Sequence, residues 1–261
     1  MLNSMFKYNE KTNHWILDFK IFKIKFKKTP KKNENIKYSI IGLNNKVLLV
    51  DTLNESKLIN KKIKGLEISV NGNNNNITIA NDCIFNNTKI IVNANNCTIN
   101  IGHNCRLNNL NIMALFGNSQ QLHIEEKVVC LGANIHLKDE QASVYIGANT
   151  LLSHDIHIWA TDGHALIDNT SKKCLNFPTK GIRIGSNCWI TFGVTITKGA
   201  EIQDNTVVGA CSVLTKSFNE SNILLAGNPA KIIKHNINWD PRPPYTYISE
   251  TKNLKLSSLE N

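Results

Sequence analysis

Aliphatic residues recur at every sixth position over one stretch of the chain. Between residues 184 and 214 the pattern has no exception: Ile184, Ile190, Ile196, Ile202, Val208 and Leu214. An α-helix needs apolar spacing near 3.6 and a flat strand needs 2, whereas a six-residue step is the period of a parallel β-helix of short strands and turns. Small or β-branched residues follow four positions later, at Cys188, Val194, Ala200, Thr206 and Ser212. Three such hexads predict one three-sided coil that stacks on the next.

A looser form of this pattern precedes it, as an apolar residue followed two positions later by isoleucine. These isoleucines are Ile79, Ile101, Ile124, Ile146 and Ile184, and the first three intervals between them are nearly equal. Such intervals predict coils with a few extra residues at one corner. The last interval is too long for a coil by about sixteen positions, so residues 161–181 are expected to leave the stack as an excursion loop. Loops of this kind often carry function.

The chain divides into three predicted parts. Residues 1–65 are expected to form a small amino-terminal β or α+β domain, with short strands in the aromatic and β-branched run 15–26, a strand at 46–50 and a short helix at 54–63. Residues 66–235 form the β-helix, in which the asparagine-rich tract 71–76 makes a corner because asparagine tolerates left-handed backbone angles. Residues 230–237 form a capping strand or helix. Residues 236–261 form a carboxy-terminal extension, which the prolines at 241–244 predict to be an extended arm.

Charge and composition limit the partners. The formal net charge is +10, and seven lysines crowd between residues 20 and 32. Such a patch favours an anionic polysaccharide, a phosphate-bearing cofactor or the inner membrane surface, while a solvated strand face is an equal alternative. Nucleic acid is not expected, since aromatic residues suited to base stacking are not interleaved and no binding motif is present.

The sequence also predicts where the protein works and the state of its thiols. It has no uninterrupted apolar stretch of the length that crosses a bilayer, and residues 1–10 lack the order of a secretion signal, so a cytoplasmic protein is expected. Seven cysteines include no Cys-x-x-Cys pair. Cys83, Cys105 and Cys188 each follow an aliphatic rung position by four residues, which favours structural packing over metal or redox chemistry.

The motifs of residues 146–234 closely resemble the hexapeptide-repeat acyltransferases, similar to sugar and capsule polysaccharide O-acetyltransferases. Three segments carry the resemblance: the rung IGSNCWI at 184–190, the run VGACSVLTK at 208–216 and the closing AGNPAK at 226–231. The family fold is a left-handed parallel β-helix, and its members transfer an acetyl group from acetyl-CoA. The resemblance therefore implies a homotrimer that binds acetyl-CoA and a carbohydrate acceptor.

The family's catalytic base is a histidine on the excursion loop, in a Gly-His context some twenty-odd residues before an Asn-x-Trp rung. Gly163-His164 and Asn187-Cys188-Trp189 match that arrangement, which implies that His164 takes the proton from the acceptor hydroxyl. Either Asp155 or Asp162 is expected to orient an imidazole by accepting from its second N–H. Strand alternation places His157 opposite its apolar neighbours. Both His157 and Trp189 are expected to contact substrate.

Three histidines on a β-helix also raise the idea of a zinc-dependent carbonic anhydrase of the γ class. The intervals between His154, His157 and His164 are three and seven, whereas that family has a pair five residues apart. No metal is therefore expected.

The resemblance further implies that coenzyme A lies in a groove between subunits. The small residues Gly193 and Ala210 suit the pantetheine arm, and Thr215 and Lys216 are expected at the nucleotide end. Lys231 and Lys234 are expected to face phosphate, because ammonium groups bind phosphate as point charges. The sequence departs from the family at Thr191-Phe192, where small residues are usual, so the groove or the acceptor pocket is expected to differ there.

Together these features predict a cytoplasmic acetyl-CoA-dependent O-acetyltransferase acting on a sugar hydroxyl of a bacterial surface polysaccharide or its precursor. Peripheral contact with the membrane or with glycan-assembly machinery is consistent with the basic surface. Two alternatives stay open: an N-acetyltransferase acting on a nucleotide-linked amino sugar, and a non-catalytic scaffold that binds glycan.

Overall fold

The structure is a computed structural model that describes residues 6–9, 14–19, 22–27, 38–51, 56–58, 63–177 and 180–257. The chain divides into two units, residues 1–36 and 37–261. In the first unit, strands β1 (Phe6–Asn9), β2 (His14–Phe19) and β3 (Phe22–Lys27) form an antiparallel sheet in that order. Short strands predicted for residues 15–26 are therefore present.

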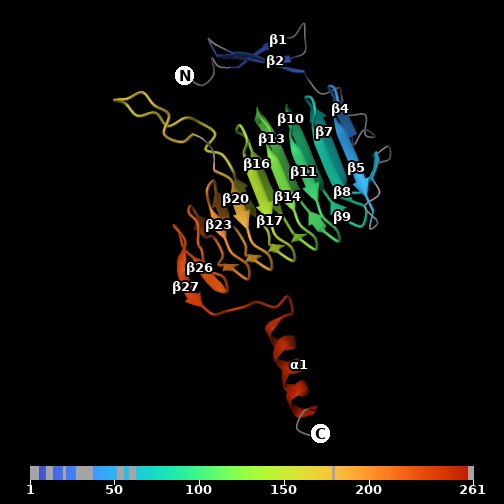
Figure 1. The fold of residues 1–261 in the computed structure, drawn as a ribbon, viewed down its shortest axis with the longest axis vertical. Helices are drawn as coiled ribbons and strands as arrows, with labels where there is room; N and C mark the ends of the chain where they lie inside the picture. The colour runs from blue at the N-terminus through green and yellow to red at the C-terminus, as the bar shows by residue number, and fades with distance from the viewer. Residues whose placement is uncertain are drawn as a thin grey trace. The chain divides into compact units, whose positions relative to one another are not determined.

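The described part of the second unit contains three eight-stranded sheets and one helix (Figure 1). Sheet 1 contains β4 (Tyr38–Ile41), β7 (Leu66–Asn71), β10 (Thr88–Asn95), β13 (Leu110–Asn118), β16 (Ala133–Leu137), β19 (Ile156–Trp159), β22 (Thr195–Thr197) and β25 (Val213–Leu214). Sheet 2 contains β5 (Lys46–Val50), β6 (Ser56–Leu58), β8 (Asn76–Ala80), β11 (Thr98–Ile101), β14 (Gln121–Ile124), β17 (Ser143–Ile146), β20 (Ile182–Ile184) and β23 (Glu201–Ile202). Sheet 3 contains β9 (Ile84–Asn86), β12 (Arg106–Asn108), β15 (Val129–Cys130), β18 (Leu151–Leu152), β21 (Trp189–Ile190), β24 (Val207–Val208), β26 (Ile223–Ala226) and β27 (Lys231–His235).

The chain visits sheets 1, 2 and 3 in turn, so each circuit is one coil of a three-sided parallel β-helix. Successive coils are in register, since Ile90 pairs with Ile68 of the preceding coil and with Ile112 of the following one. Across the long interval, Ile158 pairs with Ile196. The coil lengths predicted from the sequence are confirmed.

The aliphatic hexad positions point into the coils. All six, from Ile184 to Leu214, are at most 1% exposed, and the small residues that follow them are also buried. Fully burying one such side chain stabilises the fold by about 1.5–3 kcal/mol. The parallel strands therefore stack around one continuous apolar core.

Extra residues in the longer coils lie at one corner, between sheets 1 and 2. The chain between the aligned core positions Ile90 and Ile101 is nearly twice as long as the chain between the equivalent Ile196 and Ile202. Asparagines line this corner: Asn74 and Asn96 adopt φ near +57°, and the buried Asn75 donates from Nδ2 to Ala94 O and accepts at Oδ1 from Cys97 N. The corner predicted for residues 71–76 is confirmed.

Three predictions at the edges of the β-helix differ from the structure. The first coil begins at β4 and β5, which pair with β7 and β8, so the helix starts one full coil before the boundary expected at residue 65. Residues 56–58 form strand β6 along β5 where a helix was expected, because the open edge of β5 offers a full row of backbone partners.

The tail also differs from the prediction. Helix α1 (Pro244–Ser257) replaces an extended arm, since proline at a first helical position has a suitable φ and lacks only an N–H that would be unpaired there. The predicted capping element is present as β27, antiparallel to β26. No helix within the described residues has the length and apolar character needed to cross a membrane.

Candidate functional site

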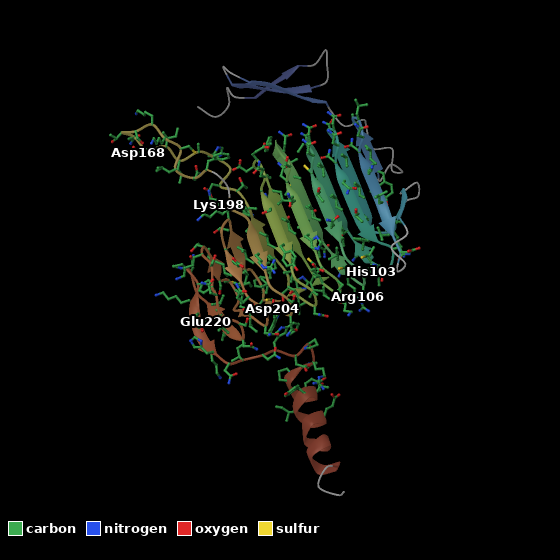
Figure 2. The ribbon with its side chains drawn as sticks, in the orientation of Figure 1. His103, Arg106, Asp168, Lys198, Asp204 and Glu220 are labelled. Carbon is green, nitrogen blue, oxygen red and sulfur yellow. The ribbon has the colours of Figure 1, made fainter. Side chains whose placement is uncertain are left out.

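The excursion loop, residues 161–181, leaves the stack after β19 and returns at β20, at the corner between sheets 1 and 2 (Figure 1). Its arms form a hairpin in which Leu175 N donates to Leu166 O at 2.8 Å. At the tip, Asp168 accepts from the backbone N–H groups of Thr170 and Ser171. Figure 2 shows Asp168 at this tip and Lys198 near the base of the loop. The predicted excursion is therefore present, and hydrogen bonds join its described arms.

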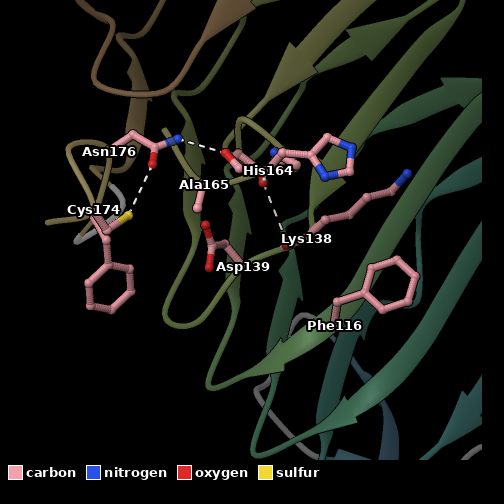
Figure 3. A pocket seen from close by; sticks show the side chains of 10 residues that line it. Phe116, Lys138, Asp139, His164, Ala165, Cys174 and Asn176 are labelled. Atoms are coloured by element: carbon pink, nitrogen blue, oxygen red, sulfur yellow. Dashed lines mark hydrogen bonds between the residues drawn. The ribbon is translucent and has the colours of Figure 1, made fainter. Parts of the chain in front are cut away.

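A cavity of about 570 Å³ lies where the loop meets the stack, and His164 is part of its wall. The wall combines loop residues with residues from the preceding coils: Phe116, Lys138, Asp139, Thr161, Gly163, His164, Ala165, Cys174, Asn176 and Phe177. Figure 3 shows the His164 imidazole and the Lys138 side chain extending to the same side. Gly163 adopts φ +74°, a left-handed angle that favours glycine, directly before His164.

Asn176 connects the two arms of the loop at His164. Its Nδ2 donates to His164 O at 2.8 Å and to Asp162 Oδ2 at 2.7 Å, and its Oδ1 accepts from Leu166 N at 2.9 Å. Lys198 Nζ from the next coil donates to Asn176 O at 2.8 Å. The amide therefore fixes the backbone that carries the imidazole, and it was not predicted from the sequence.

Asp162 forms an ion pair with Lys198, not a hydrogen bond with His164. The Asp162 Oδ2 to Lys198 Nζ distance is 2.6 Å. Partial burial would raise the pKa of Asp162, but the hydrogen bonds from Lys198 and Asn176 outweigh it and lower that pKa. Asp162 therefore carries negative charge and anchors the loop base, and in this structure its carboxylate bonds Lys198 and Asn176.

Asp155 contacts His157, at 3.2 Å between Oδ1 and Nε2. This pair lies at the start of β19, at the other end of the strand from the loop. His157 also meets the edge of Trp159, whose ring stacks on His136 with centroids 5.1 Å apart. Burial, together with Lys138 and His157, lowers the pKa of His136 to about 4. Neither His136 nor Trp159 was singled out from the sequence.

Trp189 lies on the outer face of sheet 3, where it is 36% exposed. Its Nε1 donates to Ser153 Oγ at 3.3 Å, and its ring packs against Trp239 with centroids 5.9 Å apart. Trp239 donates from Nε1 to Asn187 O at 2.7 Å. Because sheet 3 lies opposite the corner between sheets 1 and 2, one chain does not bring Trp189 to His164.

The residues expected to bind the cofactor fall at two corners. Gly193 and Ala210 lie between sheets 3 and 1, where a Cβ on Gly193 would be 3.2 Å from Cys211 Sγ. Lys231 is close to that corner, paired with Ala226, and Lys234 lies further along β27. Thr215 and Lys216 are at the corner between sheets 1 and 2, where the Lys216 ammonium lies 5.5 Å from the Phe218 ring centroid. Gly193, Ala210 and Lys231 therefore lie near one corner, whereas Thr215 and Lys216 lie at another.

Three cavity residues that the motifs did not indicate could have been found from the length of a coil. Phe116, Lys138 and Thr161 follow one another at intervals of one wide coil, so they occupy equivalent places at the corner that the loop leaves. Asn176 and Lys198 have no comparable signal, because their partners depend on the path of the loop.

The cysteine side chains are thiols of the β-helix and its excursion loop. All seven cysteines are free. Cys105 and Cys188 are fully buried as the rung pattern predicts, whereas Cys83 is only partly buried. Burial raises the pKa of Cys188 to about 12. No three histidine, cysteine, aspartate or glutamate side chains in the described ranges gather as a metal site.

This chain matches a protein-family model and is similar in sequence to known proteins. Residues 181–216 match the family model described as bacterial transferase hexapeptide, six repeats. The chain is 33% identical over 205 residues to the polysialic acid O-acetyltransferase of Neisseria meningitidis, covering 77% of this chain and 88% of that protein. It is 34% identical over 122 residues to the polysialic acid O-acetyltransferase of Escherichia coli O1:K1, covering 47% of this chain and only 39% of that longer protein.

A solved structure matches the fold over most of both chains. The crystal structure of the polysialic acid-specific acetyltransferase NeuO aligns with a TM-score of 0.57 and 26% identity, covering 86% of this chain and 98% of that one. The family and fold predicted from the sequence are confirmed. The chain belongs to the hexapeptide-repeat acyltransferases, whose fold is a left-handed parallel β-helix.

Proposed function

We propose that this protein is an acetyl-CoA-dependent O-acetyltransferase that acts on an anionic capsular polysaccharide, with His164 as the general base. The observation that carries the proposal is His164 in the wall of a 570 Å³ cavity at the root of the excursion loop. Similarity over 88% of the meningococcal polysialic acid O-acetyltransferase supports the reaction and the acceptor class. The free thiols agree with action in the cytoplasm.

In this mechanism the His164 imidazole accepts the proton of a sugar hydroxyl as the oxygen attacks the thioester carbonyl. The tetrahedral intermediate then collapses, the carbon–sulfur bond breaks, and the imidazolium returns the proton to the leaving thiolate. General-base assistance of this kind is typically worth about 10² to 10⁴ in rate. Asn176 and Gly163 hold the backbone of His164, so the ring starts from a fixed Cα position at the cavity wall.

The cavity also suits an anionic acceptor. Lys138 and His164 both line the cavity and extend to the same side of it in Figure 3, and Phe116 and Phe177 supply apolar walls for the sugar carbons. Lys198 is held by Asp162 and is therefore already neutralised. Lys138 is thus the cation proposed to meet an acceptor carboxylate.

A homotrimer is part of the proposal, because His164 and Trp189 lie on opposite sides of one coil. A site that uses both must take them from two chains. The loop supports this arrangement, since four of its apolar side chains are about 60% exposed: Leu166, Ile167, Leu175 and Phe177. An exposed apolar group of this size on one loop indicates a protein contact.

Coenzyme A is proposed to bind along the corner that carries Gly193 and Ala210. Gly193 adopts φ +70°, and a Cβ there would lie only 3.2 Å from Cys211 Sγ, so glycine suits this corner and leaves its backbone without a covering side chain. Lys231, close to the same corner, and Lys234 are proposed to face phosphate, with Thr215 and Lys216 completing the site from a neighbouring chain. Phe192 is 55% exposed at this corner, where the family usually has a small residue, and is proposed to narrow the groove.

The test is thiol release from acetyl-CoA in the presence of polysialic acid, other capsular polysaccharides and amino-sugar nucleotides. We expect acceptor-dependent release with polysialic acid, and a decrease of about 10² to 10⁴ for His164→Ala. His103→Ala removes a histidine between β11 and β12 (Figure 2), away from both the cavity and the corner of Gly193, and serves as the matched control. Equal rates for wild type and His164→Ala would contradict the proposal, and release only with amino-sugar nucleotides would redirect it to N-acetyl transfer.

A further inference from the structure

The outer face of sheet 2 carries a second cavity of about 330 Å³ that the proposed chemistry does not use. It spans β11, β14, β17 and β20, and seven of its eleven lining residues have polar side chains: Thr98, Asn100, Gln121, Leu122, His123, Ser143, Val144, Tyr145, Gly181, Ile182 and Arg183. Four strands at about 4.8 Å spacing make this groove roughly 15 Å long. It is therefore longer than a single sugar ring.

One side of the groove is a column of stacked planar groups. The His123 and Tyr145 rings are nearly parallel, at 3°, with centroids 5.5 Å apart. The Arg183 guanidinium carbon lies 4.2 Å from the Tyr145 ring centroid on the same column. Stacking on an aromatic face fixes the plane of a guanidinium without consuming its N–H edge.

Glu125 holds the column from one side. Its Oε1 accepts from Tyr145 Oη at 3.1 Å and lies 3.0 Å from His123 Nε2. Burial and the neighbouring Glu125 raise the pKa of Tyr145, which keeps the phenol protonated. The two rings therefore form a rigid support for Arg183.

Arg183 is half exposed and only loosely paired. Its side chain is 51% exposed, and it forms an ion pair with Glu201 whose Nε to Oε1 distance, 3.8 Å, is longer than a hydrogen bond, so an anion can compete for the guanidinium. On the other side of the groove, Thr98, Gln121 and Ser143 form a row of hydroxyl and amide groups. A fixed guanidinium beside such a row matches a carboxylate-bearing sugar with several hydroxyls.

The groove begins at the foot of the loop that carries His164. Gly181, the last loop residue, forms part of its wall, and a Cβ there would lie 2.2 Å from Ser143 Oγ. A side chain at 181 would therefore displace Ser143. The first cavity includes Lys138 and Asp139, and the groove includes Ser143, so the two are separated only by the turn at residues 140–142.

We propose that this groove binds the acidic polysaccharide chain that flanks the sugar being acetylated, with Arg183 binding a carboxylate. The proposal rests on the proposed function for the identity of the polymer. It makes the enzyme dependent on chain length, since a short acceptor fills the His164 cavity without reaching Arg183, and a long one occupies both.

The test uses polysialic acid fragments of graded length as acceptors. For Arg183→Gln we expect KM for long fragments to increase about tenfold with kcat unchanged, and no change in either constant for the shortest acceptor. Arg183→Lys should restore only part of the loss, because an ammonium does not keep the planar arrangement. Arg106→Gln, which removes the same charge from the outer face of sheet 3 (Figure 2), is the matched control.

Direct binding of long fragments without acetyl-CoA separates this proposal from the proposed function. Binding that weakens for Arg183→Gln but not for Arg106→Gln supports the groove even if no acetyl transfer is observed. Equal weakening by both variants would show general attraction to a basic protein and would overturn it. Equal binding of carboxyl-reduced polymer would overturn the role of the carboxylate, and transfer that depends on His164 but not on Arg183 would leave only the proposed function.

Discussion

The coils before residue 161 and those after residue 181 share one three-sided plan but close the corner between sheets 1 and 2 differently. In the later coils a single hexad step separates the aligned core positions Ile196 and Ile202, and small side chains fill the turn. In the earlier coils the equivalent separation is nearly twice as long, and asparagine side chains bond from coil to coil. The comparison shows that a parallel β-helix tolerates a change of width when the added backbone at one corner finds hydrogen-bond partners.

The largest expected difference between the two regions concerns apolar truncation. Ile112→Ala in an early coil and Ile196→Ala in a late coil both remove a side chain that is at most 1% exposed, and each should cost about 2–5 kcal/mol in free energy of unfolding. The wider coil has more backbone with which to close the cavity, so we expect the smaller cost at Ile112. Chemical denaturation measures both. A larger cost at Ile112 would show that the asparagine corner is rigid.

Asn75 tests whether buried amides hold the wide corner. It is 1% exposed, donates to Ala94 O and Asn45 Oδ1, and accepts from Cys97 N. We expect Asn75→Ala to lower the free energy of unfolding by about 1–3 kcal/mol, because buried partners lose their hydrogen bonds. Thr206→Val in a narrow coil keeps the shape and removes a single hydroxyl bond to Gln203 O, so a loss of about 1 kcal/mol or less is expected. Similar losses for the two variants would argue against an amide-dependent corner.

His136 gives the smallest expected effect, on pH dependence. Its folded-state pKa is about 4, below the value of about 6.5 in an unfolded chain. Between pH ~4 and pH ~6.5 the unfolded state binds more protons at this histidine than the folded state does. The stability that neutral His136 gives the folded state is therefore present above pH ~6.5 and is lost as the pH falls toward 4. Thermal unfolding from pH 7 to pH 4 should show a smaller decrease for His136→Gln than for wild type. An unchanged pH profile would mean that other groups determine acid stability.

The repeating parts of the molecule were predictable because aliphatic residues at every sixth position fit a parallel β-helix and neither an α-helix nor a flat strand. The core positions, the coil lengths and the excursion loop all follow from the period. The first coil was not recognised, since β4 and β5 keep only fragments of the pattern and their outer faces are partly exposed.

The candidate site was predictable only in part. His164 stands out by motif, whereas its supports Asn176 and Lys198 depend on how the loop folds back. Asp162 illustrates the limit: its place next to Gly163-His164 in the sequence favours a triad, yet the nearest cation is Lys198 from the following coil. Spacing in the sequence does not show which of several possible partners a side chain will contact in the folded protein.

The register across the excursion loop has a further consequence. Val144 pairs with Ile182, and Ile158 with Ile196, as if the intervening residues were absent, so the strands on either side are aligned by their own core contacts. The loop is therefore an insert that the scaffold holds at its base, through Lys198 and through Gly199 N, which donates to Gly181 O, while its outer part bonds to itself. A solenoid of this kind can exchange acceptor specificity by replacing one cassette while every coil stays in place.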